Sequence, residues 1–378
     1  MIDYKNKDHC CGCSACEEVC PVQAIKMHRD ALGFLYPELN EGICLKCNLC
    51  SNVCPFENDV EGGNIRDAYA ARHNSVEEVK SSRSGAVFVA LSDAILKSGG
   101  VIYGAGYGDF FRVKHKRASS KDGCAEFKGS KYSQSDIRGV FVLIEKDLKD
   151  GLSVLFSGTP CQCAAVRRVI KDRYKSRLYL VDFVCHGVTS PAFWEDFLKW
   201  VEKGTWHKIR SVDFRDKNYF GWDGLHKESF LLDNGRKYIA PYIYYNDMHM
   251  RPSCAECPFS SLNRASDVTM GDMWGCSTVC PEMNQDNNGC SLVIVNTEKG
   301  SSLFQQASSY LTIQTLDIRQ CIQPNLVKPT ERSRNADMFY LDYKERGFDY
   351  ILSKYYPSRM RLFCMRVIGF VNRTLKRE

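Results

Sequence analysis

Long apolar runs are absent from this sequence: nowhere do 18 apolar residues follow one another, and no apolar core comes after the opening residues MIDYKNKDH. The pattern of a membrane-spanning helix and that of a secretory leader are therefore both missing. We expect a cytoplasmic protein, whose thiols stay reduced. Low-complexity tracts are absent too, and 44% hydrophobic residues with 12% aromatics suffice for a sizeable packed core.

Cysteine, in contrast, is abundant, with 20 in 378 residues. The stretches CCGCSACEEVCP and CLKCNLCSNVCP each contain C-x2-C-x2-C-x3-C followed by proline. Disulfides are disfavoured in a reducing compartment, and structural zinc usually takes two close pairs separated by a longer loop. Three cysteines at steps of three instead bind one 4Fe-4S cluster, and the fourth ligates the neighbouring cluster. The doubled ladder therefore predicts two 4Fe-4S clusters and resembles the bacterial two-cluster ferredoxin.

Each predicted cluster has four ligands, the last of them exchanged between the ladders. The first cluster is expected to take Cys10, Cys13, Cys16 and Cys54. The second cluster is expected to take Cys44, Cys47, Cys50 and Cys20. Cys11 fits neither ladder and is interpreted as a spare residue.

Three segments are expected along the chain. Residues 1–62 form an α+β ferredoxin-like N-terminal domain, and the polar stretch ENDVEGGNIRD is typical of a linker. Residues 63–345 form a larger α/β domain with a mixed sheet. Residues 346–378 form a basic amphipathic C-terminal helix or tail.

The body alternates between apolar strands and helical stretches. Strands are expected in VIYGAGY, SVLFSG and LYLVDFVC, and helices in SGAVFVALSDAILKSGG, in PCQCAAVRRVIKDRY and from about Pro191 to Glu202. This alternation favours an α/β layer with a partly parallel sheet. Residues 209–240 indicate antiparallel ribbons around an Asn-Gly turn. The glycines of GAGYG miss the dinucleotide-binding spacing and indicate close packing.

Four further thiols stand out in the body. Cys161 follows SGTP, where a strand turns into a helix, so free backbone amides favour an anionic cluster or a phosphate there. Cys185 ends the strand LYLVDFVC, and Cys254 and Cys257 form the pair in RPSCAECPF. Four thiols are what a third 4Fe-4S cluster requires. A zinc site using the same pair, or buried cysteines acting as small hydrophobes, are the alternatives.

The body resembles the coenzyme F420 hydrogenase/dehydrogenase beta-subunit family. The resemblance runs from about residue 65 to beyond residue 300, in the stretches SRSGAVF, GSKYSQS, LFSGTPCQ, DFVCHGVTSP, RDKNYFGW, RPSCAECPF, ASDVTMGDMWG and GCSLVIVNT. It implies FAD beside one 4Fe-4S cluster, with a ferredoxin module as a common N-terminal partner. Carried over by motif, the ligands of that third cluster are Cys161, Cys185, Cys254 and Cys257.

Electron counting gives the expected function. Iron–sulfur clusters ordinarily move one electron whereas hydride donors move two, so a flavin must stand between them. We expect an iron–sulfur flavoprotein oxidoreductase in which electrons pass from a hydride donor to FAD, to the body cluster and to the ferredoxin clusters, or in reverse. The resemblance implies a reduced deazaflavin (coenzyme F420), NAD(P)H or another redox partner as the donor.

Candidate flavin contacts lie in three of the motifs. Ser84 and Gly85 open a helix whose amide end favours a pyrophosphate, and Lys131 in GSKY pairs with phosphate or flavin charge unless it is an exposed loop lysine. The turn around Cys161 adds Gly158, Thr159 and Gln162.

No acid–base residue stands out from the sequence. His186 and Lys131 are weak catalytic candidates, and a histidine beside a cluster more often hydrogen-bonds to sulfur. The family pattern is broken by Ala86, where a second glycine is usual, and by Cys163, where the residue is generally aliphatic. Cys276, Cys280 and Cys290 follow GDMWG; their C-x3-C-P hints at a further metal, but spare cysteines are favoured. The cysteines left unassigned are Cys124, Cys321 and Cys364.

The charge distribution bears on partners. The formal +6 omits the clusters, each about −2 with its four thiolates, so three clusters cancel it and no nucleic-acid partner is expected. Residues 1–62 hold five Lys/Arg against ten Asp/Glu, which leaves +11 on the rest. An acidic ferredoxin on a basic body favours intrachain docking, although a solvated acidic face explains it equally well. The expected partners are a redox protein or a small-molecule donor and acceptor.

The C-terminal segment and two other function classes complete the expectations. Residues 360–375 carry a helical apolar stripe among basic residues, which either packs on its own domain or lies on the inner face of a membrane. The chain is alternatively an electron-transfer subunit without its own substrate site, which serves a partner enzyme and is linked to surface-polysaccharide biosynthesis. In a second alternative, zinc at Cys254 and Cys257 is a structural clip.

Overall fold

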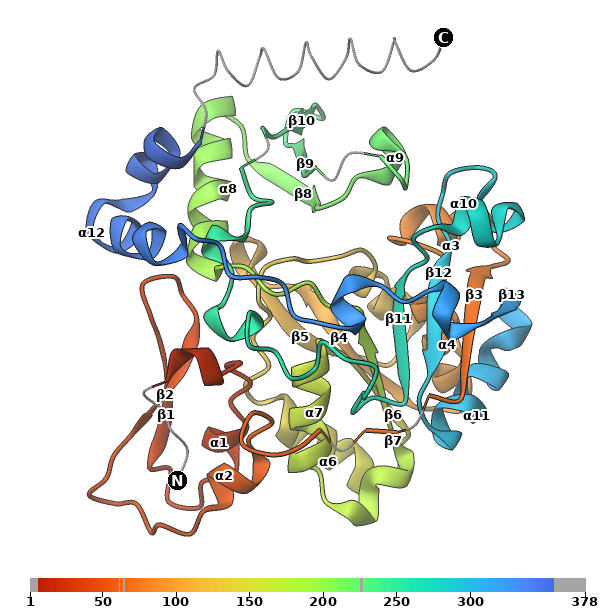
Figure 1. Cartoon of the computed structure of the whole chain (residues 1–378), viewed down its shortest axis with the longest axis horizontal. Helices are drawn as coiled ribbons and strands as arrows, with labels where there is room; N and C mark the ends of the chain where they lie inside the picture. Colours follow the sequence, from red (N-terminus) through yellow and green to blue (C-terminus); the bar gives the residue numbers. More distant parts are fainter. Residues whose placement is uncertain (1–5, 61, 64, 225–226, 242, 357–378) are drawn as a thin grey trace.

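A mixed eight-stranded sheet lies at the centre of the body (Figure 1). The computed structural model describes residues 6–60, 62–63, 65–224, 227–241 and 243–356. The strand order is β13-β3-β12-β11-β7-β6-β4-β5, in which β11, β7, β6 and β4 are parallel neighbours and the other pairs are antiparallel. The strands are β3 (Asp67–His73), β4 (Val101–Tyr107), β5 (Val113–Ala118), β6 (Val154–Ser157), β7 (Leu178–Phe183), β11 (Val268–Asp272), β12 (Ser291–Val295) and β13 (Leu311–Leu316).

Helices cover both faces of this sheet, because its strands are apolar on both sides. On β6, Leu155 packs with α4 and α11, whereas Val154 and Phe156 pack on the opposite face with α6 and α7. These helices are α4 (Val87–Lys97), α6 (Val140–Lys149), α7 (Pro160–Val169) and α11 (Glu298–Ala307), with the short α3 (Val76–Ser81), α5 (Lys121–Cys124) and α10 (Cys276–Val279) at the periphery. The predicted α/β layer is confirmed.

The expected helices and strands of the body all occur. The helix expected from about Pro191 is α8 (Pro191–Thr205), and Gly104 lies against the Phe127 ring, where an added Cβ would come within 2.7 Å. The ribbon expected over 209–240 consists of β8 (Ile209–Asp213), β9 (Ser229–Leu232) and β10 (Lys237–Ile239). Asn234 and Gly235, the latter at φ +78°, form the turn between β9 and β10. A short helix, α9 (Lys217–Phe220), separates β8 from β9.

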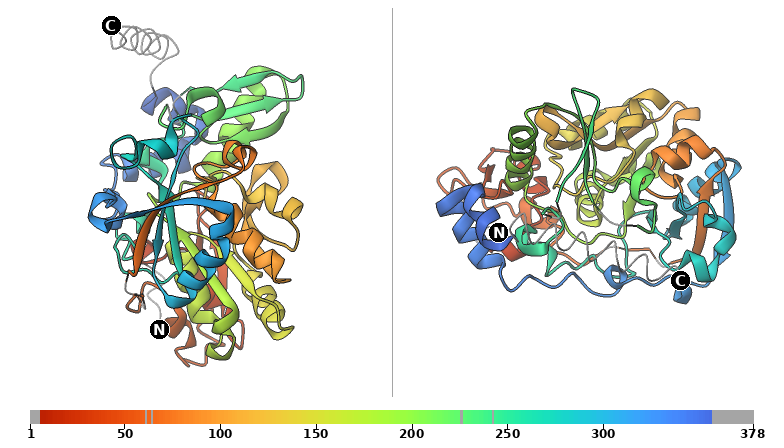
Figure 2. Two further views of the ribbon diagram at one scale, coloured as in Figure 1. Left: turned by 90° about the vertical axis from the view of Figure 1, so that its right-hand side faces the viewer. Right: turned by 90° about the horizontal axis from the view of Figure 1, so that it is seen from above.

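An aromatic core joins this ribbon to α8 and to the last described helix, α12 (Ala336–Tyr355). Phe193 and Trp194 of α8 contact Phe214, Tyr244 and Phe339. Figures 1 and 2 show α12 and the β8–β10 ribbon at the same end of the molecule. The expected division at residues 345/346 lies next to a kink at Gly347, which separates α12 into two helical stretches, and the second stretch also packs in the aromatic core. The segment 357–378 with its apolar stripe lies outside the described residues.

The ferredoxin segment repeats one backbone conformation at its two cysteine ladders. Ser14 and Asn48 precede the third cysteine of their ladders by two residues, and both are left-handed, at φ 64° and 61°. Gly12 and Lys46, two residues earlier, are also left-handed. The segment contains β1 (Ile25–Arg29) antiparallel to β2 (Leu35–Leu39), with α1 (Ala15–Glu18) and α2 (Leu49–Val53). Successive amides turned in this way form concavities that favour anions.

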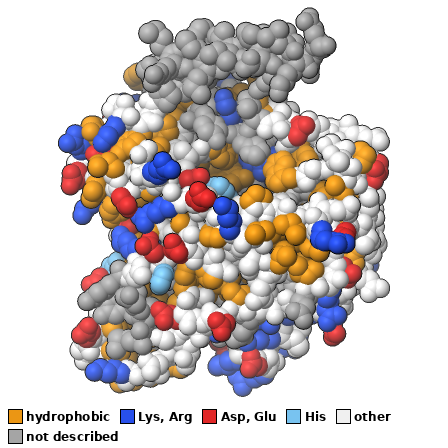
Figure 3. All heavy atoms as spheres, viewed as in Figure 1, with side chains coloured by type: hydrophobic (Ala, Val, Ile, Leu, Met, Phe, Trp, Pro, Cys, Tyr) orange, Lys and Arg blue, Asp and Glu red, His pale blue; other side chains and the backbone are white. Residues whose placement is uncertain are grey.

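The ferredoxin segment packs directly on the body. Its Cys11, Cys13 and Ala15 join the core beneath α6 and α7, and Phe34 and Tyr36 join the aromatic core. On the face drawn in Figure 3, acidic and basic side chains are intermixed. None of the helices in the described residues is long and apolar enough to cross a membrane.

Candidate iron–sulfur and flavin sites

The structure brings the first predicted ligand set together at the start of α1. Cys16 interacts electrostatically with Cys10 and Cys54, and Cys13 interacts with Cys16 and Cys54. Burial raises the pKa of the Cys16 and Cys54 thiols, and the like charges of the other thiolates raise it further. Thiols arranged in this way ionise when a cation compensates them, which fits the donor set of an iron–sulfur cluster.

The second predicted ligand set lines a hollow in the outer half of the ferredoxin segment. The hollow holds about 380 Å³ of empty space, and its sulfur atoms come from Cys20, Cys44, Cys47 and Cys50. The backbone N–H of Ala24 donates to Cys20 Sγ at 3.2 Å, and that of Lys46 donates to Cys44 Sγ at 3.4 Å. Hydrogen bonds of this kind stabilise thiolates and tune cluster potentials. The individual ligand assignments of both sets stay predictions.

The four body thiols line one hollow of about 530 Å³. Cys161 lies in the first turn of α7, Cys185 follows β7, and Cys254 and Cys257 come from a loop before β11. Cys185 interacts electrostatically with the other three. Burial raises the pKa of Cys254 to about 12 and that of Cys257 to about 11. Four thiols around one hollow fit a third cluster, and this assignment also stays a prediction.

The turn before Cys161 is fixed by a chain of hydrogen bonds. Thr159 caps α7; its Oγ1 lies 3.1 Å from Cys161 Sγ, and its N–H donates to Gln162 Oε1 at 3.1 Å. The Gln162 amide donates to Ser135 Oγ at 3.0 Å, and Ser135 Oγ lies 2.9 Å from His115 Nδ1. His115 Nε2 lies 2.8 Å from the Ser157 carbonyl oxygen and must donate to it, so Nδ1 accepts the Ser135 proton.

Two residues of this turn have clear physical constraints. Burial lowers the pKa of His115 to about 4, which keeps the ring neutral between Ser135 and Ser157. At Gly158 a Cβ would meet the Phe156 ring at 2.8 Å and Gln162 Oε1 at 3.0 Å, so only glycine fits. The predicted Gly158, Thr159 and Gln162 therefore lie together beside Cys161. His115 carried no sequence signal, because its partners are remote in the chain.

Arg251 lies between the first ferredoxin ligand set and the body hollow, which it also lines. Its side chain is 1% exposed; Nε donates to the Cys10 carbonyl oxygen at 2.6 Å, and Nη2 donates to the Leu35 carbonyl oxygen at 2.8 Å. Nη2 also lies 3.6 Å from Cys10 Sγ, and the guanidinium lies over the Tyr36 ring. Sequence reasoning missed Arg251, although it opens the RPSCAECPF motif.

Cys11, interpreted from the sequence as spare, links the two sulfur sets. Its buried thiol interacts with the thiols of Cys13 and Cys161, and Cys11 lines the body hollow together with Cys161. Its carbonyl oxygen accepts from the Gln134 amide at 2.7 Å, and the Gln134 side-chain oxygen accepts from Arg251 at 2.9 Å. The first ferredoxin set and the body set are thus separated by a single side chain.

His186 and Lys131, the weak catalytic candidates, lie apart. His186 lines the body hollow, but its Nε2 pairs with Asp247 Oδ1 at 2.8 Å and its Nδ1 with Thr330 Oγ1 at 3.1 Å, so oxygen atoms take both ring nitrogens. The hydrogen bond with Asp247 raises the pKa of His186. Lys131 is half-buried rather than exposed; its Nζ donates to the Lys128 carbonyl oxygen at 3.1 Å. Burial lowers the pKa of Lys131 to about 8.

Ser84 and Gly85 lie against the sheet. The Ser84 hydroxyl donates to the Cys290 carbonyl oxygen at 2.6 Å, and the Gly85 N–H donates to Ser291 Oγ at 2.9 Å. A Cβ at Gly85 would come within 2.3 Å of the Ala71 carbonyl oxygen, so glycine is required for packing. The helix α4 begins at Val87, with left-handed Ala86 before it. Their role as pyrophosphate contacts stays a prediction.

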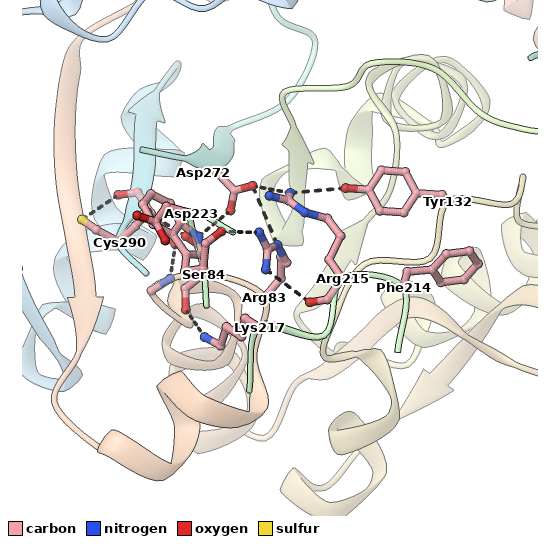
Figure 4. A network of polar contacts seen from close by, with 12 residues as sticks. Arg83, Ser84, Tyr132, Phe214, Arg215, Lys217, Asp223, Asp272 and Cys290 are labelled. Carbon is pink, nitrogen blue, oxygen red and sulfur yellow. Dashed lines mark hydrogen bonds and ion pairs between the residues drawn. The ribbon is translucent and has the colours of Figure 1, made fainter. Parts of the chain in front are cut away.

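Two arginines converge on the Asp272 carboxylate, and Lys217 lies nearby against Ser84 (Figure 4). Arg215 donates to Asp272 Oδ2 at 2.6 Å and to the Tyr132 hydroxyl at 3.3 Å, and Arg83 Nε lies 3.9 Å from the same carboxylate oxygen. Lys217 donates to the carbonyl oxygens of Val79, Ser84 and Asn288, and burial lowers its pKa to about 7. Asp272 ends β11, at the carboxyl edge of the parallel strands, where cofactors bind in such sheets. The basic excess fits an anionic group such as a flavin pyrophosphate.

Comparisons with known proteins agree with this arrangement. Residues 151–320 match the family described as the C terminus of the coenzyme F420 hydrogenase/dehydrogenase beta subunit, and residues 9–58 match the 4Fe-4S dicluster domain. A search of curated proteins gave no match. Among solved structures, one similar chain belongs to the F420-reducing [NiFe] hydrogenase complex from Methanosarcina barkeri, with 19% identity and a TM-score of 0.48 over 77% of this chain and 91% of that chain. Residues 151–320 are therefore similar to the coenzyme F420 hydrogenase/dehydrogenase beta-subunit family, and a segment similar to a 4Fe-4S dicluster domain precedes them in the chain.

Proposed function

We propose that this chain is an iron–sulfur flavoprotein oxidoreductase that exchanges an electron pair with a hydride donor and single electrons with a redox partner. The donor class is a reduced deazaflavin such as coenzyme F420, or NAD(P)H, and the flow runs in either direction. FAD, when bound, supplies the conversion between two-electron and one-electron transfer. The observation that carries the proposal is Arg251, which lines the hollow of the four body thiols and whose Nη2 lies 3.6 Å from Cys10 Sγ of the first ferredoxin set.

The body residues have distinct parts in this proposal. Cys161, Cys185, Cys254 and Cys257 hold a third 4Fe-4S cluster, and Thr159 and Gln162 fix the position of Cys161. Arg83, Arg215 and Lys217 attract the flavin phosphates, whereas half-buried Lys131 provides a cation near the carboxyl edge of β4, over the Tyr107 ring. Such preorganised charges act strongly because water is excluded from their surroundings.

The partner side of the proposal is the second ferredoxin set. Cys47 is exposed there, and aliphatic side chains beside it are exposed too: Ile43 by 48%, Leu45 by 63% and Leu49 by 43%. An apolar rim around an accessible metal ligand favours a transient protein contact. We propose that single electrons pass between this edge and a redox partner protein. The same edge would serve an electron-transfer subunit without its own substrate site, which is the second candidate function.

The first test is the cofactor content of anaerobically purified protein. The proposal expects about twelve iron atoms and as many sulfides with one FAD per chain. Addition of NADPH, NADH or reduced F420 should then bleach the flavin and cluster absorbance of the holoprotein. About eight iron atoms, no flavin and no bleaching would leave only the electron-transfer function. Eight iron atoms with one zinc lost on substitution of Cys254 would favour the zinc clip instead.

A further inference from the structure

Three cysteines that the cluster assignments leave over come together in the body. Cys276 and Cys280 lie one helical turn apart around α10, and Cys290 immediately precedes β12. Their three sulfur atoms all lie within 4.8 Å of one another, and Cys276 Sγ and Cys280 Sγ are 3.3 Å apart. No sequence spacing joins Cys290 to the C-x3-C pair, because a loop separates them.

The sulfur separations decide which metal chemistry fits. Three thiolates bonded to one ion at about 2.3 Å in a trigonal arrangement lie about 4 Å from one another. The trio therefore has the spacing of ligands to a single ion. The group is also separate from the hollow lined by Cys161, Cys185, Cys254 and Cys257, to which none of the three contributes.

The surroundings of the trio are apolar and soft. The three cysteines are at most 1% exposed, and Met273 and Met283 lie in the same buried cluster. Within the described part of the chain no fourth histidine, cysteine or carboxylate joins the group. Thiolates in apolar surroundings select soft d10 ions such as Zn²⁺ and Cu⁺, whereas Mg²⁺, Ca²⁺ and Mn²⁺ prefer oxygen.

A positively charged residue, Arg72, lies near the three thiols. Arg72 of β3 interacts electrostatically with Cys276 and donates to the Met283 carbonyl oxygen at 3.0 Å. Arg72 also pairs with Asp286 in the same loop, at 2.7 Å between Nη1 and Oδ1. Glu282 adds a negative charge near Cys276. The arginine ties the loop to the sheet and reduces the cost of an anionic thiolate site.

We propose that Cys276, Cys280 and Cys290 bind one thiophilic d10 metal ion, Zn²⁺ or Cu⁺, at a mononuclear three-thiolate site. The thiol protons are released to solvent when the ion binds, and no electron is transferred. The ion fastens α10 to the start of β12. None of the three cysteines belongs to an iron–sulfur ligand set, whereas the carbonyl oxygen of Cys290 accepts a hydrogen bond from Ser84 beside the proposed flavin contacts.

The test compares metal contents of anaerobically purified full-length protein. Zinc, copper and iron are counted for the unaltered chain, for Cys280→Ser and Cys290→Ala, and for Cys321→Ser as the control, a buried cysteine of the same apolar cluster. We expect about one zinc or copper ion per chain to be lost in the two trio variants only, with iron unchanged. Equal zinc and copper contents in all four proteins would overturn the proposal.

X-ray absorption at the zinc or copper edge gives a second test that uses only the unaltered protein. It therefore applies even if a variant fails to fold. The expected first shell has three sulfur neighbours at about 2.3 Å for zinc. Four sulfur neighbours would assign the ion to a ferredoxin or body set and refute the site. A Cys276–Cys280 disulfide in the mass spectrum of anaerobic protein would refute it as well.

Discussion

Arg251 Nε donates a hydrogen bond to the carbonyl oxygen of Cys10 across 241 residues of sequence, at 2.6 Å. This contact joins the loop of the body hollow to the first ladder of the ferredoxin segment. The same guanidinium reaches Leu35 and Gln134. One side chain therefore connects two sulfur sets and fixes their relative position.

Replacement of Arg251 by alanine should destabilise the protein by about 3 kcal/mol, because the buried carbonyl oxygens of Cys10 and Leu35 lose their donor. It should also lower the midpoint potential of the nearest cluster, since a positive charge that favours reduction is removed. Denaturant unfolding and redox titration followed by electron paramagnetic resonance measure the two effects. Arg251→Lys keeps the charge, so it should retain most of the potential while still losing stability.

Replacement of Cys13 by serine should remove about four iron atoms per chain, because a ligand of one cluster is lost. Cys11→Ser should leave the iron content unchanged, since Cys11 bonds to the ligands without belonging to either set. Cys163→Ser, a buried cysteine of the same core, is the matched control. Loss of four iron atoms from Cys11→Ser would show that the ladder rule assigns the ligands incorrectly.

The Gly158→Ala substitution should destabilise the protein by about 1–3 kcal/mol, because the added Cβ meets Phe156 and Gln162. Iron held by the body set should fall with it, as Cys161 moves. Gly204→Ala in α8 is the control: nothing lies within 4 Å of its added Cβ, and the change should stabilise by up to about 1 kcal/mol. Urea titration measures the change in stability, and iron analysis measures the iron content. Equal effects at Gly158 and Gly204 would contradict the packing argument.

The His186–Asp247 pair should make stability depend on pH. The hydrogen bond to Asp247 raises the pKa of His186 above its ordinary 6.5, so the pair's contribution is complete below pH 6.5 and is lost as pH rises through the raised value. The melting temperature of Asp247→Asn should therefore fall below that of the unaltered protein at pH 6 and approach it at pH 8.5. A difference that is constant with pH would show that the pair is not ionic.

Arg83→Gln should weaken FAD binding about tenfold, which corresponds to about 1.4 kcal/mol, because one of the two arginines that pair with Asp272 is removed. Arg319→Gln is the control, since Arg319 is exposed and pairs only locally with Asp317. Fluorescence titration of apoprotein with FAD gives both affinities. An unchanged affinity in Arg83→Gln would place the flavin phosphates elsewhere.

The parts of the fold that sequence could predict are those encoded by local pattern. The ladders, the α/β alternation, the start of α7 at Pro160 and the Asn234-Gly235 turn each depend on residues close together in the chain. The family resemblance of the body also follows from short motifs. The kink of α12 at Gly347 lies close to the expected division at residues 345/346, but the aromatic contacts that pack both halves of α12 come from partners distant in sequence.

The site was predicted less completely, for the same reason. Cys161, Cys185, Cys254 and Cys257 could be selected by context, but Arg251 and His115 act through partners that only the fold brings near. The approach of Cys290 to Cys276 and Cys280 depends on a loop held by Arg72, which no local spacing indicates. Residues whose partners are far away in the sequence cannot be identified from local sequence patterns.

The burial of Arg251 has a consequence for the order of assembly. Its hydrogen-bond acceptors are neutral carbonyl and amide oxygens, and a buried cation of this kind is costly unless negative charge lies near it. Neutral thiols provide little of that charge, whereas a cluster with its thiolates provides about −2. Cluster insertion and docking of the ferredoxin segment are therefore thermodynamically linked. Binding of the cluster strengthens docking, and docking strengthens binding of the cluster by the same free energy. Loss of iron would then weaken the contact between the ferredoxin segment and the body.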